Sequence, residues 1–519
     1  MKLLLIDIDT LRADHLGCYG YDRATSPAID SIAADGVCFR DYYCSDAPCL
    51  PSRAALFSSR FCFHNGVINH GGLRADPFPE GATRGFKDKA ATNSLPAMMR
   101  TYGMYTASIS TFPERHSAWW FNAGFNEMYN VGKSGDETAD EVTPIALDWL
   151  DRNRSREDWF LHVHYWDPHT EYRAPAELGN PFAGQPSEGL SWIDEEVFRK
   201  HRQAVGFHTA QELNMYGESV SEAHRLRQLG KLESLDDVRH NMDGYDCGIL
   251  YADMAVGQII QRLKELGIYE ETAIIVTSDH GEAMGELGRY SEHGTADQSV
   301  TRIPLVIKWP GALTGGRVLS GLHYNIDLLP TLIALLGDDP AAIPYGQYLQ
   351  AQYGADYKKV YLQMILESYD GKSFAESILS GSEDGRDHLV VSMATHSVQR
   401  AVRFGDYLYI RTYHDAYALF PDDMLFNIKE DPHEQHDLAE ELPDKVHEGA
   451  CILEKWITEQ MRINAPLGLG DPIWTVLGEG GGFHSLGAMP GYLDRLEKTG
   501  RSEQAQALLE KYPQYKDKR

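Results

Sequence analysis

The sequence predicts an α/β fold with a large, mostly parallel sheet sandwiched by helices. The runs Leu3–Ile8 and Thr272–Thr277 are short and aliphatic, which is typical of strands that are buried on both faces. Thr106–Ile109 and Phe160–His164 are further predicted strands, and each follows a helical stretch. Tyr251–Leu266 has apolar residues on one face, as expected of a helix that covers a sheet. Alternating strands and helices favour a parallel sheet with helices on both sides.

Two helices and a strand are predicted between the strand at Leu3–Ile8 and the strand at Thr106–Ile109. The pair Ser26-Pro27 can cap and start a helix that ends just before Val37–Tyr43, the next predicted strand. Another helix is predicted over Ser52–Ser59, where three good helix formers stand together. These elements extend the same alternation toward the amino-terminal half of the sheet.

The pattern changes in the last quarter of the chain. Three short strands joined by polar turns are typical of a small antiparallel sheet, and a helix over about Asp444–Met461 should pack on it. The predicted strands are Leu389–Met393, Gln399–Phe404 and Tyr407–Tyr413. The sequence therefore predicts a catalytic domain over residues 1–385 and a C-terminal subdomain over residues 386–519.

Two segments do not fit either sheet. Residues 176–245 are polar and mostly helical in pattern, so we interpret them as an insertion over the sheet edge and a candidate substrate lid. The C-terminal tail is expected to be rich in loops. Its Gly478–Gly482 run lacks the Gly-Lys-Ser/Thr of a phosphate-binding loop, so we interpret it as a flexible loop.

Composition limits the kinds of binding partner and the cellular compartment that we expect. The net charge of −28 over 519 residues argues against nucleic acids and anionic membranes as main partners. Seven scattered cysteines indicate reduced thiols rather than a disulfide framework. The first apolar run is too short for a signal peptide, and no run reaches membrane-spanning length. We expect a cytoplasmic protein without a membrane partner, and a homo-oligomer stays open.

Cys49-Leu50-Pro51-Ser52-Arg53 is the most informative stretch of the chain. Pro51 suits the first turn of a helix, because its ring fixes φ and its missing N–H would be unpaired there. Cys49 then lies at or just before a helix N-terminus, where free N–H groups favour a thiolate or a substrate oxyanion. Arg53 can hold an anionic oxygen with its planar fork. A structural cysteine on a core helix is the alternative explanation.

Three further residues indicate a metal site. Asp9, Asp279 and His280 follow predicted strands that are far apart in the sequence. Ligand sites in such sheets lie beyond the carboxyl ends of the strands, so the three side chains can converge on one divalent cation. Carboxylates suit Ca²⁺ or Mg²⁺, whereas an imidazole favours Mn²⁺ or Zn²⁺. Capping of a following helix is the alternative role for each aspartate.

Together these motifs resemble those of the type I sulfatases, a family of the alkaline phosphatase superfamily. Cys49–Arg53 resembles the Cys-x-Pro-Ser-Arg signature, Ser278–Glu282 resembles the second metal motif, and Asp9–Gly20 resembles the first. Ser58–Arg60 stands where Thr-Gly-Arg is usual, and Thr10 stands where many members have a second acid. The likeness runs from residue 2 to about residue 440.

The resemblance implies an alkaline-phosphatase-like fold and an essential modification. Cys49 would be oxidised to formylglycine by a formylglycine-generating enzyme, and the hydrate of this aldehyde would attack the sulfur of a sulfate ester. The implied metal ligands are Asp9, Asp279, His280 and residue 49, with Asp7 as a further candidate. One divalent cation is expected, with Ca²⁺ as the first choice and Mn²⁺, Mg²⁺ or Zn²⁺ as alternatives.

The resemblance also implies which side chains surround the sulfate. His169 resembles the histidine that protonates the leaving oxygen, whereas Arg53, His293 and Asn69 resemble residues that neutralise or line the sulfate pocket. Many sulfatases carry a Gly-Lys-Trp-His segment after the strand near residue 108, and this chain lacks it. The candidates to replace that segment are His70, Arg115 and His116.

These observations predict a metal-dependent sulfuric ester hydrolase that acts on a small anionic ester. A sulfated saccharide is the preferred substrate, because Trp119, Trp120 and Tyr172 would suit stacking on a sugar. The missing Gly-Lys-Trp-His segment leaves open a phosphonate monoester or phosphodiester hydrolase of the same superfamily. A catalytically inactive binding protein is disfavoured, since the cysteine and the metal motifs are retained.

Overall fold

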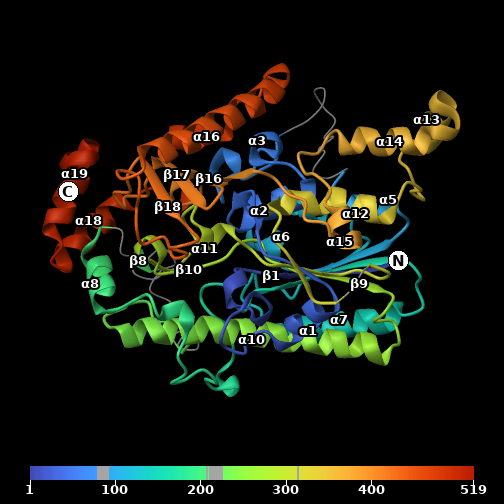
Figure 1. The fold of residues 1–519 in the computed structure, drawn as a ribbon, viewed down its shortest axis with the longest axis horizontal. Coiled ribbons are helices and arrows are strands. Elements are labelled where there is room, and N and C mark those ends of the chain that lie inside the picture. Colours follow the sequence, from blue (N-terminus) through green and yellow to red (C-terminus); the bar gives the residue numbers. More distant parts are fainter. Residues whose placement is uncertain (79–92, 206–207, 210–225, 313–314, 519) are drawn as a thin grey trace.

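A computed structural model describes residues 1–78, 93–205, 208–209, 226–312 and 315–518 of the chain. Within this part, the largest sheet has eight strands in the order β13-β2-β12-β9-β1-β7-β5-β6 (Figure 1). The strands are β1 (Lys2–Ile8), β2 (Val37–Phe39), β5 (Tyr105–Ile109), β6 (Glu127–Tyr129), β7 (Trp159–Tyr165), β9 (Thr272–Thr277), β12 (Leu305–Lys308) and β13 (Arg317–Leu319). Only β12 runs antiparallel to its neighbours, so the predicted mostly parallel sheet is confirmed.

Helices cover both faces of this sheet, as Figure 1 shows. Successive side chains of a strand point to opposite faces, so Leu4 and Ile6 of β1 share one core with α1, α7 and α10, whereas Leu3 and Leu5 share the other with α2 and α12. These helices are α1 (Pro27–Asp35), α7 (Ala139–Asn153), α10 (Leu235–Glu265), α2 (Cys49–Ser58) and α12 (Leu328–Leu336). The unbroken aliphatic run of β1 follows from this double burial.

A second sheet has the order β18-β17-β16-β15-β4. Its antiparallel part matches the predicted C-terminal sheet, and α16 (Pro443–Asn464) packs on it. The strands are β4 (Asp46–Ala47), β15 (His388–Met393), β16 (Val398–Phe404), β17 (Tyr407–His414) and β18 (Asp423–Asn427). β4 comes from the amino-terminal part of the chain and pairs with β15. One hydrophobic core therefore runs from the large sheet into the second sheet.

Shorter elements complete the described structure. The helices are α3 (Cys62–Asn65), α5 (Leu95–Thr101), α6 (Phe112–Arg115), α8 (Glu195–Gln203), α11 (Gln298–Thr301), α13 (Gly346–Tyr353), α14 (Tyr357–Leu366) and α15 (Ala375–Ser380). The strands are β3 (Tyr42–Tyr43), β8 (His208–Thr209), β10 (Ala283–Met284), β11 (Arg289–Glu292) and β14 (His323–Tyr324). Along the described residues, no helix has both the length and the apolar composition needed to cross a bilayer. All seven cysteines are free thiols.

Three local predictions were wrong. The strand predicted over Val37–Tyr43 is divided, because its last two residues form β3 and pair with β14 instead of β12. Helix α10 begins well before Tyr251, since Ser234 and Asp237 form a capping box that starts it. The tail is not rich in loops. It forms three helices, which are α17 (Pro472–Glu479), α18 (Met489–Lys498) and α19 (Ser502–Lys511).

A buried ion pair attaches this tail to the second sheet. Arg400 of β16 donates two hydrogen bonds, both of 2.7 Å, to Asp471, and its guanidinium stacks on Phe63 at 4.6 Å. Asp471 also accepts from the N–H of Ile473 and so caps α17. The Arg400 side chain is only 1 % exposed, and Asp471 is the carboxylate that it bonds among the described residues.

Removal of this carboxylate should destabilise the protein strongly. In Asp471→Ala, the Arg400 guanidinium stays buried without its partner, and we expect the free energy of unfolding to fall by about 3–5 kcal/mol. The shift of the urea midpoint measures this loss. Asp494→Ala is the matched control, because Asp494 pairs with Lys498 at an exposed site and should cost less than about 1 kcal/mol. Equal shifts in the two variants would contradict this account.

Candidate active site

Two aspartates meet at the carboxyl edge of the large sheet. β1 and β9 are neighbouring parallel strands, so Asp9 and Asp279, which follow them, reach the same edge. The backbone N–H of Thr10 donates to Asp279 Oδ1 at 3.1 Å, and the Thr10 hydroxyl donates to Asp9 Oδ1 at 2.7 Å. Both aspartates are buried. Thr10, which stands where classical sulfatases carry a second acid, therefore orients the two carboxylates.

Helix α2 places Cys49 beside these acids. The helix begins at Cys49 with Pro51 in its first turn, as predicted, and all of its residues are buried. Cys49 Sγ lies 3.1 Å from His280 Nε2. Burial and the negative charge of Asp9 and Asp279 raise the pKa of the Cys49 thiol well above its usual value. The unmodified side chain is therefore a neutral thiol and a weak nucleophile.

The donor atoms around Cys49 fit a divalent cation. Ligand atoms of Asp9, Cys49, Asp279 and His280 lie within 4.8 Å of one another. The Nδ1–H of His280 donates to the Gly281 carbonyl at 2.8 Å, which leaves a lone pair on Nε2. Burial lowers the pKa of His280 to about 3, so the ring is neutral. His280 Nε2 lies 3.1 Å from Cys49 Sγ and 3.4 Å from an oxygen of Asp279, a spacing that would let all three atoms bind one cation.

Arg53 of α2 is the counter-ion of three buried carboxylates. Its Nε–H and one Nη2–H donate to the two oxygens of Asp7 at 2.8 and 3.0 Å. Nη1 donates to Asp9 at 2.9 Å and to Asp279 at 2.5 Å. Nη2 also donates to His164 Nε2 at 2.7 Å. These contacts use all five N–H groups of the side chain, which is fully buried.

This geometry bears on two of the predicted roles. All five donors of Arg53 go to the acids and to His164, so the side chain organises these acids, and its predicted contact with a sulfate oxygen stays a prediction. Asp7 was a candidate metal ligand, but both of its oxygens bind Arg53 and it lies outside the group of four. Burial and the charges of Asp9 and Asp7 keep the pKa of Asp279 well above its usual range despite Arg53. A divalent cation at the group of four would balance this excess of negative charge.

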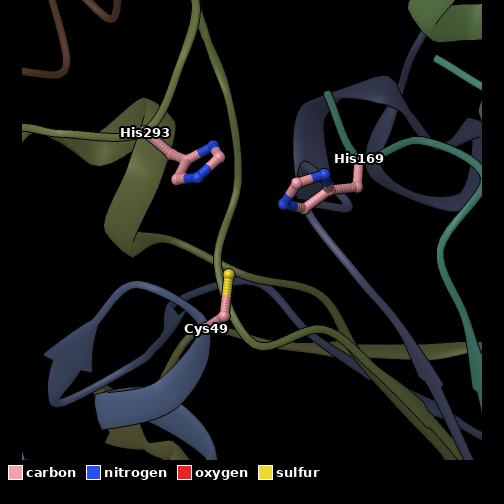
Figure 2. A group of neighbouring side chains, drawn as sticks. All are labelled: Cys49, His169 and His293. Carbon is pink, nitrogen blue, oxygen red and sulfur yellow. The ribbon is translucent and has the colours of Figure 1, made fainter. Parts of the chain in front are cut away.

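Two histidines lie on either side of the space that the Cys49 sulfur faces, as Figure 2 shows. One ligand atom from each of the three side chains lies within 4.8 Å of the others. Burial alone would lower the pKa of His293, but Glu282, 3.2 Å from its Nδ1, helps to raise it to about 9. Burial lowers the pKa of His169 well below its usual value, and its Nδ1–H donates to the Thr170 carbonyl. At neutral pH, His293 is a cation and His169 presents an acceptor at Nε2.

A cavity of about 640 Å³ is lined by Cys49 and these histidines. The size is that of a small-molecule site. Arg115 also lines it, donates to the Ser134 carbonyl at 3.1 Å and stacks over Trp166 at 5.0 Å. No carboxylate among the described residues pairs with Arg115. The cavity therefore contains a guanidinium that is available to an anion, and the predicted residues His70, His116, His169 and His293 line it with Arg115.

Asn69 has a different place from the one predicted. It is not among the described residues that line the cavity. Its Oδ1 accepts hydrogen bonds from the backbone N–H groups of His70 at 2.9 Å and Phe483 at 3.2 Å. Asn69 therefore connects the loop after α3 to the C-terminal tail and acts on the cavity through its neighbours.

Phe483 and His484 line the cavity and were missed by the sequence reasoning. They follow α17, and His484 Nε2 shares a hydrogen bond of 2.9 Å with His70 Nδ1. Gly482 allows this segment to approach, since a Cβ there would lie 2.3 Å from the His396 carbonyl oxygen. The predicted flexible loop is thus a packed turn. The three glycines directly before Phe483 and His484 were the signal in the sequence that could have indicated a close approach of this segment to the cavity.

The predicted aromatic wall is not found among the described residues that line the cavity. Trp119 and Trp120 do not belong to its lining, and Tyr172 is fully buried against Tyr245. Phe483 supplies the aromatic surface instead. The described part of residues 176–245 does not contribute to the lining either.

The lid itself stays a prediction. Part of the proposed segment, residues 206–207 and 210–225, lies outside the described residues. In the part that is described, His201 of α8 contacts the Tyr290 hydroxyl at 2.7 Å, which places this helix against β11. That contact holds α8, in the first part of residues 176–245, against the three-stranded sheet that contains β11.

The chain matches a family model described as Sulfatase over residues 2–338. It belongs to the sulfatase family. The match covers Cys49, Arg53, Asp279 and His280 and confirms the resemblance found in the sequence, including the class of sulfuric ester hydrolases. The turn that carries Phe483 and His484 lies beyond the matched range.

Curated relatives and solved structures are similar over most of the chain. An N-acetylglucosamine-6-O-sulfatase of Bacteroides thetaiotaomicron is 22% identical over 498 residues, covering 84% of this chain and 81% of that protein. A phosphonate monoester hydrolase of Agrobacterium radiobacter has a TM-score of 0.64 at 20% identity, covering 88% of this chain and 96% of that one. A protein in complex with its substrate D-glucosamine-2-N,6-O-disulfate has a TM-score of 0.63 at 16% identity, covering 88% and 98%. The structural likenesses confirm the fold.

Arg53→Lys should disable the site although it keeps the charge. An ammonium is a point charge and cannot reproduce the fork that holds Asp7 together with Asp9 and Asp279. We expect kcat/KM for an aryl sulfate to fall at least about a hundredfold, which corresponds to about 3 kcal/mol lost at a buried pair. Steady-state kinetics measure this loss. Arg152→Lys, at an exposed pair with Asp148, is the control and should behave like the wild type.

Proposed function

We propose that this sulfatase is a metal-dependent enzyme whose nucleophile is a formylglycine made from Cys49. The observation that carries the proposal is the position of Cys49 at the start of α2, in one group with Asp9, Asp279 and His280. The surroundings of Cys49 disfavour a thiolate, so a modified side chain suits this position better than the thiol. As a formylglycine hydrate, residue 49 would supply one hydroxyl to attack sulfur and a second to expel sulfate. A formylglycine-generating enzyme is the maturation partner that this implies.

The proposed metal ligands are Asp9, Asp279, His280 and the modified residue 49. Two carboxylates favour Ca²⁺, while the imidazole keeps Mn²⁺, Mg²⁺ and Zn²⁺ as alternatives. When bound, the cation would supply positive charge to the oxygens of the sulfate and to the nucleophile. Arg53 acts beside it as a positioning residue, since it holds both aspartates in place.

Three side chains would then act on the ester directly. The His293 imidazolium and the Arg115 guanidinium can neutralise the sulfate oxygens that the metal does not contact. His169 is assigned the proton transfer to the departing oxygen. An anionic ester beside it would raise the pKa of its imidazole, which burial otherwise holds low. His116 and His70 complete the wall where the Gly-Lys-Trp-His segment is missing.

A sulfated saccharide is the proposed substrate class. One similar protein is named an N-acetylglucosamine-6-O-sulfatase, and another similar structure holds D-glucosamine-2-N,6-O-disulfate as its substrate, which supports this choice. The cavity of about 640 Å³ has room for a sugar ring beside the sulfate. We also propose a cytoplasmic location, for which seven free cysteines are the support, and no nucleic-acid partner, given the acidic net charge.

A phosphonate monoester or phosphodiester hydrolase is the second candidate function. The similarity in fold to the phosphonate monoester hydrolase supports it, and both reactions need an anion held by cations. The sulfatase model covers the Cys49 motif, so sulfate esters are the preferred substrates. The two functions differ in the relative rates on an aryl sulfate and an aryl phosphonate monoester.

The modification of Cys49 is directly measurable. In protein co-expressed with a formylglycine-generating enzyme, mass spectrometry of the peptide that contains residue 49 should show the aldehyde in place of the thiol. Cys49→Ala should lose at least about a thousandfold in kcat/KM for an aryl sulfate, whereas Cys451→Ala, at a partly exposed thiol far along the chain, should not. A fully active protein with an unmodified thiol at residue 49 would falsify the mechanism. Faster turnover of the aryl phosphonate than of the aryl sulfate would favour the second function.

Metal removal should abolish hydrolysis and destabilise the site. Without a cation, the buried carboxylates of Asp9 and Asp279 repel each other, so dialysis against a chelator should lower both the activity and the thermal midpoint. Addition of Ca²⁺ or Mn²⁺ should restore both, and elemental analysis should give one ion per chain. Asp279→Asn should reduce that metal content, while Asp338→Asn, outside the group, serves as the control. Undiminished hydrolysis in the chelated protein would contradict both enzymatic functions.

A further inference from the structure

We propose that the chain with an unmodified Cys49 binds a thiophilic divalent ion, with Zn²⁺ as the expected ion, through Cys49, His169 and His293. These side chains offer one sulfur and two imidazole nitrogens that all lie within 4.8 Å of one another. The set is distinct from the group of four at the sheet edge, with which it shares only Cys49. The inference concerns the chain before the proposed modification, so it goes beyond the proposed hydrolysis and does not depend on it.

Both histidines have the hydrogen bonds that metal-ligating histidines usually have. The Nδ1–H of His169 donates to the Thr170 carbonyl. The Nδ1–H of His293 donates to Glu282 at 3.2 Å. Each ring therefore has Nε2 left for a ligand. A hydrogen bond from the other ring nitrogen to a carbonyl or a carboxylate fixes the ring and makes the ligating nitrogen more basic. Figure 2 shows the two rings on either side of the space that the Cys49 sulfur faces.

The three donor atoms determine which class of ion fits. Thiolate and imidazole are ligands of Zn²⁺ and of related transition ions, whereas Ca²⁺ and Mg²⁺ take oxygen ligands. A tetrahedral zinc ion holds its sulfur and nitrogen ligands about 3.3–3.7 Å apart, so the three donors need to approach one another by at most about 1.5 Å. Three protein ligands leave a fourth position for water, and the cavity that these residues line has room for it.

The charges around Cys49 favour a cation at the sulfur. Burial and the charges of Asp9 and Asp279 raise the pKa of the free thiol, but the same charges attract a positive ion that binds the sulfur. A thiol that coordinates a metal ion loses its proton outright. At His293, the ion takes the place of the proton on Nε2, while Glu282 keeps its hydrogen bond with Nδ1. Binding therefore releases the thiol proton and this imidazole proton to water, and it needs no oxidant.

The site exists only in the unmodified chain, because formylglycine has no sulfur. A chain that escapes modification is therefore a zinc-binding protein with a masked thiol. Among the described residues, none of the other six cysteines belongs to a group of three possible metal ligands. Cys451, for example, lies 3.5 Å from His447 at an exposed position, but no third donor joins this pair. Cys451 therefore provides a matched control for nonspecific binding by a thiol.

Metal titration of the full chain, produced without a formylglycine-generating enzyme, tests the site. The protein is treated with a chelator and then titrated with Zn²⁺ or Co²⁺ in an excess of Ca²⁺, which competes for the oxygen-rich group of four. Elemental analysis should find one Zn²⁺ per chain. The Co²⁺ form should show a sulfur-to-cobalt charge-transfer band in the near ultraviolet and strong visible bands typical of four ligands. Bound Zn²⁺ should also protect Cys49 from alkylation.

Variants assign the ion to the named residues. His169→Ala and His293→Ala should each weaken Zn²⁺ binding at least about a hundredfold, because loss of a ligand costs more than loss of its hydrogen-bond partner. Glu282→Gln removes no ligand but weakens the support of His293, and it should cost about ten- to hundredfold. This variant keeps the test decisive where a ligand variant unfolds. Cys451→Ala is the control and should bind Zn²⁺ as the wild type does.

Three results would overturn the inference. The first is an unmodified chain that holds no Zn²⁺ in excess Ca²⁺. The second is Zn²⁺ binding that is lost in Asp279→Asn but retained in the variants of His169, His293 and Glu282, because the ion would then belong to the group of four. The third is equally tight binding by the formylglycine-containing enzyme. Hydrolysis of an aryl sulfate by that enzyme tests the proposed function separately, so the two failures are distinguishable.

Discussion

The site depends on one guanidinium surrounded by three buried carboxylates. Arg53 is fully buried, and its donors are shared among Asp7, Asp9, Asp279 and His164. Without this cation, the acids at the sheet edge would be buried beside one another with no compensating charge, at a cost of several kcal/mol per ion. With it, two carboxylates are fixed in orientation, and two excess negative charges remain for a divalent metal ion to balance. Arg53 of α2 thus connects the acids of β1 to Asp279, which follows β9.

Topology explains why these groups meet although the sequence separates them widely. β1 lies between β7 and β9, so the residues that follow each strand share one edge of the sheet. Helix α2 packs on the face that Leu3 and Leu5 occupy, and the same alternation directs Asp7 toward Arg53. Cys49, the proposed nucleophile, therefore needs no flexible loop, because its helix is buried along its whole length. A rigid frame of this kind suits a reaction that depends on placed charges.

Local sequence patterns were sufficient to predict the large sheet and the residues that meet at its carboxyl edge. The aliphatic runs, the proline after Cys49 and the Ser-Asp-His sequence each have a local physical cause, and the structure brings those residues together as predicted. The sequence was not sufficient where the place of a side chain depends on which of several hydrogen-bond partners it meets in the folded protein. The sequence does not show that Asp7 would accept two hydrogen bonds from the guanidinium of Arg53. It also does not show that Asn69 would bind the backbone of Phe483. Contacts across more than four hundred residues leave no local signal, which is why the tail was interpreted as a loop.

The packed turn at Gly482 has a consequence for the order in which the protein matures. The last wall of the cavity comes from residues near the opposite end of the chain from Cys49, and it closes only after α17 has docked on the second sheet. During synthesis, the segment with the cysteine leaves the ribosome long before Phe483 exists. An enzyme that modified Cys49 during elongation, as proposed, would therefore act before this wall of the cavity exists.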